Sequence, residues 1–394
     1  MPGGEQDSEE REDRLRSVVG LSLKLGITAF GGPAAHIAML RHEVVSRRAW
    51  LTDQHFLDLL GVTNLIPGPN STEMVMHVGQ NRAGGRGLML AGIAFIVPAA
   101  TITMFFAWLY VRYGTTPRGE WLLDGIKPVI IAVVGQALWS LGRTAIKDVT
   151  SGSIAVGVLA LYLAGANEIV LLFGGALLLV GLRQAVGEFK RHVSAVRGLA
   201  PVAVPSLMGL AAAAADAKVP YTALRLFLTF VKIGSVLYGS GYVLLAFLRN
   251  DFVVRYGWLT EQQLLDAVAV GQVTPGPVFT TATFVGYVVG GFTGAVLATI
   301  AIFLPAFVFV AIVGPLVPRL RQRAVLGRLL DGVNVAAIGL MAAVTIDLGR
   351  DAIVDLPTAL LAIGSAYLLI RHNVNSAWLV VLGGVAGLLL HSLR

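Results

Sequence analysis

The chain contains one sequence pattern twice. Three segments of the first half recur 208 residues later: Phe30-Gly31-Gly32 as Tyr238-Gly239-Ser240, Trp50-Leu51-Thr52 as Trp258-Leu259-Thr260, and Pro67-Gly68-Pro69 as Pro275-Gly276-Pro277. A fixed spacing between three separate motifs indicates an internal duplication. The fold must therefore be one that two similar units build together.

These units are too apolar for a soluble protein. Hydrophobic residues make up 56% of the chain and charged residues only 13%, whereas soluble proteins carry about 25% charged residues. The mean hydropathy is +0.75, and apolar runs recur that are as long as the roughly 20 residues a helix needs to cross a bilayer. The sequence predicts an all-α polytopic membrane protein, and its duplication is typical of secondary transporters.

The charge pattern and the missing residue types exclude several function classes. The net charge of +7 does not indicate nucleic-acid binding, because the arginines lie mostly between apolar runs, where cytoplasmic loops collect them. The absence of cysteine excludes disulfides and thiolate metal sites. No phosphate-binding glycine loop, catalytic group or histidine-carboxylate metal set is evident. We expect no enzyme activity, cofactor, metal or nucleic-acid partner, and a lipid bilayer around the chain.

Both halves follow one plan of helices. We divide the chain into a polar N-terminal tail (1–17), a first repeat (18–183), a basic connector (184–220) and a second repeat (221–394). The helices predicted for the first repeat cover 18–40, a Gly- and Pro-interrupted segment at 56–80, 87–111, 126–146, and 151–182 as two short helices that turn at Asn167-Glu168. Those predicted for the second cover 221–248, 262–290, 294–317, 332–348, 357–370 and 375–390.

The Pro-Gly-Pro segments are predicted to be re-entrant. If every segment crosses the membrane, the lysines and arginines outside the apolar runs divide equally between its two sides. If both Pro-Gly-Pro segments enter and leave on one side, that side becomes richer in positive charge, as cytoplasmic faces are. Each repeat then has about five transmembrane helices plus a re-entrant broken-helix segment. Because five is odd, the repeats are expected in inverted topology, a common basis of alternating access.

These segments also carry the predicted binding site. A proline lacks an N–H donor and disfavours helix before it, and broken backbone at membrane depth must lie inside protein or beside a water-filled cavity. A half-helix that starts there would present backbone N–H groups to an anion. We predict a substrate site from Pro67, Gly68, Pro69, Asn70, Ser71 and Thr72, and from Pro275, Gly276, Pro277, Thr280 and Thr281. A simple packing kink is the alternative.

Two lysines inside apolar helices extend this prediction. Lys24 and Lys232 are 208 residues apart, and an ammonium group within a membrane helix is costly and by default functional. The alternative is that both reach to the membrane surface. Glycine clusters follow each lysine and allow close approach of a ligand or of another helix. These predicted substrate-binding residues are Gly31 and Gly32, then Gly239, Ser240 and Gly241.

Two further side chains are candidates for ion coupling. His36 lies in an apolar stretch and titrates near neutral pH, so it is assigned to both binding and coupling, with a packing role as the alternative. Glu73 follows the first Pro-Gly-Pro and could carry a proton or pair with Arg82, and its counterpart in the second half is Thr281. Asp58 and Asp266, which also match, are interpreted as helix N-terminal caps.

The motifs resemble one known family. Phe30-Gly31-Gly32-Pro33, Pro67-Gly68-Pro69-Asn70-Ser71-Thr72-Glu73, Gly271-Gln272-Val273-Thr274-Pro275-Gly276-Pro277 and Ala282-Thr283-Phe284-Val285-Gly286-Tyr287 are similar to those of the chromate ion transporter family in its long, two-domain form. One departure is Ser240, where the family pattern has glycine.

The resemblance implies chromate export across the inner (plasma) membrane, driven by a gradient and giving chromate resistance. Transport of sulfate or another oxyanion, uptake, a passive anion channel, and an enzyme acting on a lipid phosphate are the alternatives. Oligomeric state is open, with a homodimer as one option.

Overall fold

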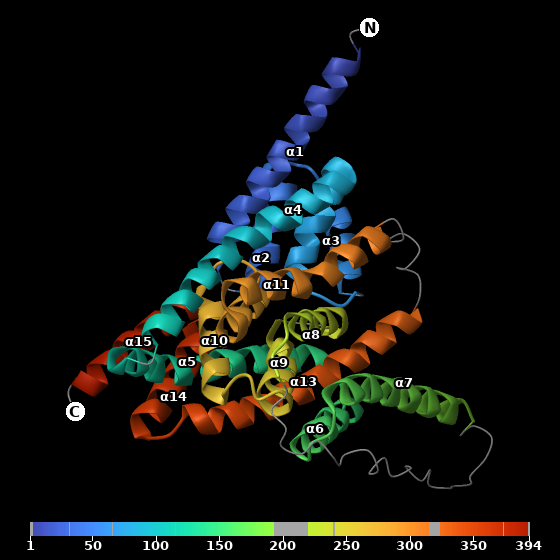
Figure 1. The fold of residues 1–394 in the computed structure, drawn as a ribbon. Helices are drawn as coiled ribbons and strands as arrows, with labels where there is room; N and C mark the ends of the chain where they lie inside the picture. Colours follow the sequence, from blue (N-terminus) through green and yellow to red (C-terminus); the bar gives the residue numbers. More distant parts are fainter. Residues whose placement is uncertain are drawn as a thin grey trace.

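Every regular element in the described part of the chain is a helix (Figure 1). The computed structural model describes residues 3–30, 32–64, 66–114, 116–192, 220–238, 241–314, 324–372 and 374–392. The helices of the first half are α1 (Gly3–Thr28), α2 (Gly32–Arg41), the π-helix η1 (His42–Arg47), α3 (Asp53–Thr63), α4 (Asn70–Tyr113), α5 (Pro117–Ala145), α6 (Val149–Leu163) and α7 (Glu168–His192). Those of the second half are α8 (Ala223–Val236), η2 (Gly241–Val243), α9 (Leu244–Leu248), η3 (Arg249–Arg255), α10 (Glu261–Val273), η4 (Val278–Thr280), α11 (Thr281–Val313), α13 (Ala324–Ala352), α14 (Leu356–His372) and α15 (Ser376–Ser392).

The first predicted helix of each repeat is wrong in one respect, because it is broken. Within 18–40, α1 ends at Thr28 and α2 begins at Gly32, which has a positive φ of 78° and is followed by Pro33. Glycine adopts this conformation without strain, and the proline ring disfavours helix before it. Within 221–248, α8 ends at Val236. Both first helices therefore end at matching positions, with two residues between the helix and the first glycine of its cluster.

The structure describes most of the predicted tail but little of the predicted connector. Residues 3–17, assigned to the polar tail, are helical and continue into the rest of α1. Most of the connector, residues 193–219, lies outside the described residues. The predicted hairpin at 151–182 is confirmed as α6 and α7, with its turn at residues 164–167.

The first Pro-Gly-Pro segment forms a hairpin whose two ends lie together. α3 leads into the loop and the first leg of α4, residues 70–82, leads out of it. At the open end, Asn81 Nδ2 lies 3.0 Å from His55 Nε2, and the Arg82 guanidinium stacks over Trp50 at 5.3 Å. In the second half, Tyr221 connects the two ends of the matching segment. It contacts Trp258, just before α10, and its hydroxyl lies close to Gly290, at the turn within α11. This geometry is the one expected of a re-entrant segment, and the side of the membrane it faces stays a prediction.

A sharp turn inside α4 and α11 returns the chain from this hairpin. In α4 the turn is at Ala83 (φ −142°, ψ 23°) and Gly84 (φ 64°, ψ −154°). In α11 it is at Gly290 (φ −136°, ψ 19°) and Gly291 (φ 63°, ψ −154°). Gly79 lies against the backbone of Gly87, and Gly286 and Gly294 make the matching contact in α11. The near-identical dihedral angles demonstrate that the duplication in sequence is also one in structure.

The hydrophobic core is divided unequally between the halves. Twelve buried residues between Val18 and Phe95, from α1 to α4, form a core of their own. The corresponding second-half helices share one large core with α5, α6, α7 and α13. In Figure 1, α13 runs between the α6–α7 pair and the group of α5, α14 and α15, which it contacts through α5. A small cluster that includes Ile66 and Ala306 lies between the two cores.

Several helices have the length and composition of membrane spans. Within the described residues, four helical stretches are long and apolar enough to cross a bilayer: 70–113, 117–145, 278–313 and 329–352. Three shorter apolar helices, α6, α14 and α15, accompany them. The chain is thus a polytopic membrane protein.

Candidate functional site

The two Pro-Gly-Pro loops each bond to the other half of the chain. The N–H of Gly68 donates to the carbonyl of Leu237, at the end of α8, over 2.8 Å. The N–H of Gly276 donates to the carbonyl of Ala29, at the end of α1, over 2.9 Å. All four residues match at the 208-residue spacing. A contact that recurs with its partners exchanged is the property of a two-fold interface, so a pseudo-two-fold relates the halves at this site.

Only glycine fits at the centre of either loop. Gly68 has a φ of +142° and Gly276 a φ of +91°, which side-chain-bearing residues rarely adopt. A Cβ on Gly276 would collide with Ala99 of α4 and crowd the Gly26 carbonyl of α1. A Cβ on Gly68 would collide with the carboxylate of Glu73 and would also contact Ala306 of α11. Each loop is therefore packed on the long helix of the other half.

A helix begins immediately after the first loop. α4 starts at Asn70, and the N–H groups of Thr72 and Glu73 donate to the Pro69 carbonyl over 2.8 and 3.0 Å. Ser71 and Thr72 are buried, and Thr72 Oγ1 has no hydrogen-bond partner among the described residues. Asn70 instead donates to Asn64. The predicted donors thus lie at a helix N-terminus, and only Ser71 and Thr72 are inside the protein.

The second loop is similar, but the hydroxyls that follow it have more hydrogen-bond partners. The Thr280 N–H and hydroxyl both donate to the Pro277 carbonyl, over 2.9 and 2.8 Å, and the Thr281 hydroxyl donates to the Val278 carbonyl. The Thr103 hydroxyl of α4 donates to Thr280 over 3.3 Å, which ties this loop again to the first half. Its threonines are therefore less available to a ligand than Thr72.

Both predicted lysines are paired with carboxylates. Lys24 Nζ lies 2.6 Å from Glu43 Oε1, and Lys232 Nζ lies 2.5 Å from Asp251 Oδ2. Glu43 and Asp251 lie in the π-helices and follow their lysines by 19 residues in both halves. These acids were not among the residues predicted from the sequence, although their equal spacing in the two repeats could have indicated them. An ion pair of this kind stabilises a lysine inside a membrane protein.

Further charges connect the same segments. Glu43 also pairs with Arg47 and Arg48, at 3.1 and 3.2 Å. Asp251 lies 3.7 Å from Arg255. A second matching pair is formed by Arg41 with Asp53 at 2.7 Å and by Arg249 with Glu261 at 2.8 Å. These pairs join α1 to η1 and α2 to α3 in the first half, and α8 to η3 and η3 to α10 in the second.

His36 lies beside the second loop. Its Nε2 is 3.0 Å from the Ala29 carbonyl, the same oxygen that accepts from Gly276, so Nε2 carries the proton. The ring is buried, packs edge-on against Phe95, and its Nδ1 has no hydrogen-bond partner among the described residues. The structure thus brings His36 to the loop of the opposite half.

The glycine clusters are only partly described. Gly31, Gly239 and Ser240 lie outside the described residues. Gly32 makes the turn into α2. Gly241 packs against Val278, directly after the second loop. The prediction of close approach at Gly241 therefore has a backbone-packing explanation.

Glu73 is the least satisfied polar group at the site. Its side chain is fully buried, and neither carboxylate oxygen has a hydrogen-bond partner in the described part of the chain. It lies on the first turn of α4 and folds back against Gly68. The predicted alternative of a pair with Arg82 is not among the ion pairs of the described residues.

The interpretation of Asp58 and Asp266 as caps was wrong. The caps are Thr52 and Thr260, whose side chains accept from the N–H groups of His55 and Gln263. Asp58 accepts from Gln54 on the exposed face of α3. Asp266 is buried and accepts from the hydroxyl of Tyr110, on α4 of the other half, over 2.9 Å. A threonine that directly precedes the helix was the signal to use.

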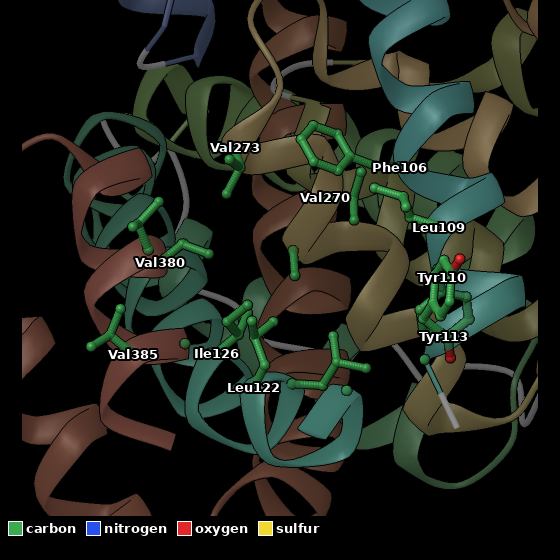
Figure 2. A pocket seen from close by; sticks show the side chains of 16 residues that line it. Phe106, Leu109, Tyr110, Tyr113, Leu122, Ile126, Val270, Val273, Val380 and Val385 are labelled. Atoms are coloured by element: carbon green, nitrogen blue, oxygen red, sulfur yellow. The ribbon is translucent and has the colours of Figure 1, made fainter. Parts of the chain in front are cut away.

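A large cavity elsewhere does not suit an oxyanion. It has a volume of about 490 Å³ and lies between α4, α5, α10 and α15. Figure 2 shows it lined by apolar side chains such as Phe106, Ile126 and Val380. Tyr110 lines it too, but its hydroxyl is engaged by Asp266. Apart from the hydroxyl of Tyr113, the other side chains of the lining offer no donor to an anion.

Fold and site together define the class of the protein as a membrane transporter built of two repeats, which contact each other at their broken helices. Comparison with known proteins identifies its family. The chromate transporter family model matches residues 17–182 and 224–388, and the chain belongs to this family. Membership implies an oxyanion substrate, and the family is one of transporters and not of enzymes.

Curated relatives match over nearly the whole chain. A chromate transport protein of Pseudomonas aeruginosa is 34% identical over 93% of this chain and 90% of its own length. One of Cupriavidus metallidurans is 30% identical over 94% and 91%. An uncharacterized transporter of Methanocaldococcus jannaschii is 25% identical over 93% and 92%. No solved structure matches the chain.

Proposed function

We propose that this protein exports chromate across the inner membrane by alternating access, driven by the membrane potential or an ion gradient, and so confers chromate resistance. The relatives of Pseudomonas aeruginosa and Cupriavidus metallidurans are chromate transport proteins, which supports the substrate. Chromate is a tetrahedral dianion, and the inside-negative potential favours its expulsion by about 2.3 kcal/mol per charge per 100 mV. ATP is therefore not needed.

The observation that carries the proposal is the exchanged pair of hydrogen bonds at the two loops. Gly68 and Gly276 bond to the ends of α8 and α1, so each half holds the broken helix of the other. In transporters made of repeats, substrate sites lie where such discontinuous helices meet. We place the oxyanion at the start of α4, where Ser71 and Thr72 face the protein interior with the N-terminal N–H groups of the helix.

The division of the core supports a moving part. The helices α1 to α3 and the first part of α4 have their own core, whereas the later part of α4 belongs to the large core and packs along α11. Units with separate cores can move as bodies, because a packed core transmits strain as a whole. In our proposal, this first-half unit moves against a scaffold in which the second-half unit is embedded, and the site opens to either side in turn.

The test is flux of labelled chromate in vesicles that contain the purified protein. An imposed potential and an excess of sulfate are applied in parallel, and protein-free vesicles are the control. Saturable, potential-driven chromate movement supports the exporter, and sulfate inhibition grades its selectivity. Flux that neither saturates nor responds to competitor indicates a channel. Absence of chromate flux with sulfate flux present reassigns the substrate.

A further inference from the structure

The buried carboxylate of Glu73 lies on the first turn of α4, beside the position that we propose for the oxyanion. One of its oxygens lies against the α-carbon side of Gly68. The N–H groups of a helix N-terminus attract negative charge at this position. The neighbouring Thr72 hydroxyl is buried and without a hydrogen-bond partner among the described residues. Neither oxygen of Glu73 accepts a hydrogen bond among the described residues, so an ionised Glu73 and an oxyanion bound beside it would place two negative charges close together in the protein interior.

Within the described part of the chain, no cation pairs with Glu73. The charged side chains on the surrounding helices have partners of their own: Lys24 with Glu43, Arg41 with Asp53, Arg249 with Glu261, Asp58 with Gln54, and Asp266 with Tyr110. Residues 281–313 of α11 contain no charged residue.

The titratable groups that do face the site are uncharged or weakly basic. Tyr238, after α8, lies within electrostatic range of Glu73. His77 follows one turn later on α4 and is buried, and His36 of α2 is engaged at Ala29. None of these groups supplies a permanent positive charge. An unpaired ionised carboxylate in such a setting is far more costly to bury than the neutral acid.

We propose that Glu73 is a proton site coupled to the oxyanion, so that one proton and one oxyanion bind together and move together. The inference rests on the proposed function and names its coupling ion. The ionised side chain repels a dianion and fills the N-terminus of α4. The protonated side chain is neutral and can donate its O–H to an oxygen of the dianion, which adds a donor to the site.

The coupling belongs to one half only. The counterpart of Glu73 is Thr281, whose hydroxyl is used by the Val278 carbonyl. One proton per dianion leaves a net charge of minus one on the moving complex, which halves the drive from the membrane potential and adds a dependence on the pH gradient. Transport of the dianion alone would depend on the potential only.

The test measures sulfate binding to the purified full-length protein by calorimetry across the neutral pH range. Sulfate is the probe because its own charge is constant there, whereas chromate itself takes up a proton. We expect the affinity for sulfate to fall by up to about tenfold for each unit by which the pH rises. We also expect uptake of one proton per sulfate, read from the dependence of the binding enthalpy on the ionisation enthalpy of the buffer.

Two variants and a control complete the design. Glu73→Gln, and Glu73→Thr as in the second half, are expected to bind sulfate without proton uptake and with the pH dependence lost. Glu120→Gln, at an exposed position on α5, should behave as the unaltered protein does. Proton uptake is measured on the unaltered protein as well, so the outcome does not depend on the variants folding.

The outcomes separate the two proposals. Sulfate binding without proton uptake in the unaltered protein overturns the coupling and leaves the transporter intact. Proton uptake that persists in a folded Glu73 variant also overturns it, since another group then carries the proton. If neither sulfate nor chromate binds at any pH, the proposed oxyanion site itself fails, and the coupling fails with it.

Discussion

Replacing Lys232 by glutamine should destabilise the protein far more than the same change at Lys24. Both lysines pair with an acid 19 residues later, but the two acids differ in the other cations that lie near them. Asp251 is 0% exposed, and its other cation, Arg255, is 3.7 Å away and 61% exposed. Glu43 keeps Arg47 and Arg48 at 3.1 and 3.2 Å.

The magnitudes follow from this difference. Removing one partner of a buried pair leaves an uncompensated charge and costs about 3–5 kcal/mol. Because Arg255 remains in reach of Asp251, we expect about 3 kcal/mol for Lys232→Gln. Lys24 is 47% exposed, and exposed pairs contribute about 0–1 kcal/mol, so Lys24→Gln should cost at most about 1 kcal/mol.

The assay is unfolding in detergent, followed by temperature and by denaturant. The double variant Lys232→Gln/Asp251→Asn removes the lysine and its nearest acid and should recover the part of the loss that Asp251 causes. Glu168, buried and 4.0 Å from Lys232, keeps its hydrogen bond from Asn250. Equal destabilisation by the two single variants, or no recovery in the double variant, would refute the reasoning. Chromate flux in the folded double variant then decides the predicted substrate contact: retained flux limits Lys232 to ion pairing, and lost flux assigns it to the site.

Two further predictions concern the loops. Gly276→Ala should lower the stability by about 2–4 kcal/mol, since it adds crowding against Ala99 to the strain of a positive φ. Gly257→Ala, at a positive φ with open space around it, should cost only the strain, about 1–2 kcal/mol. Equal losses in thermal unfolding would contradict the packing argument. Asp148, before α6, has its pKa held below the ordinary value chiefly by the N–H of Ser151. The stability that this carboxylate contributes is present above the ordinary aspartate pKa of about 3.9 and is lost as pH falls through the lowered value. Acid unfolding of Asp148→Asn should lack that component, and an unchanged profile would count against it.

Much of the fold could be predicted because repetition and hydrophobicity are local signals. The turn between α6 and α7 follows from the polar pair Asn167-Glu168 inside an apolar run, and the broken segments follow from the missing N–H of proline. The break between α1 and α2 was missed because a glycine cluster at 31–32 is compatible with either close packing or a turn. Only the backbone conformation of Gly32 separates the two.

The site was harder to predict because its contacts join distant residues. The partners of Gly68 and Gly276 are backbone carbonyls at Leu237 and Ala29, and a carbonyl leaves no trace in the residue type. The acids of the lysine pairs lie on π-helices, whose wider turns place side chains where 3.6-residue periodicity does not. Comparing the halves for acids at equal spacing would have found them.

The exchanged hydrogen bonds also bear on how such a chain arose. A single half would leave the N–H of its own loop glycine without its carbonyl acceptor. Each half is therefore completed by the other, and we expect an ancestor of half this length to have assembled in pairs. A chain cut within residues 193–219 is likewise expected to stay associated through its two loops, because the exchanged hydrogen bonds do not depend on the peptide link.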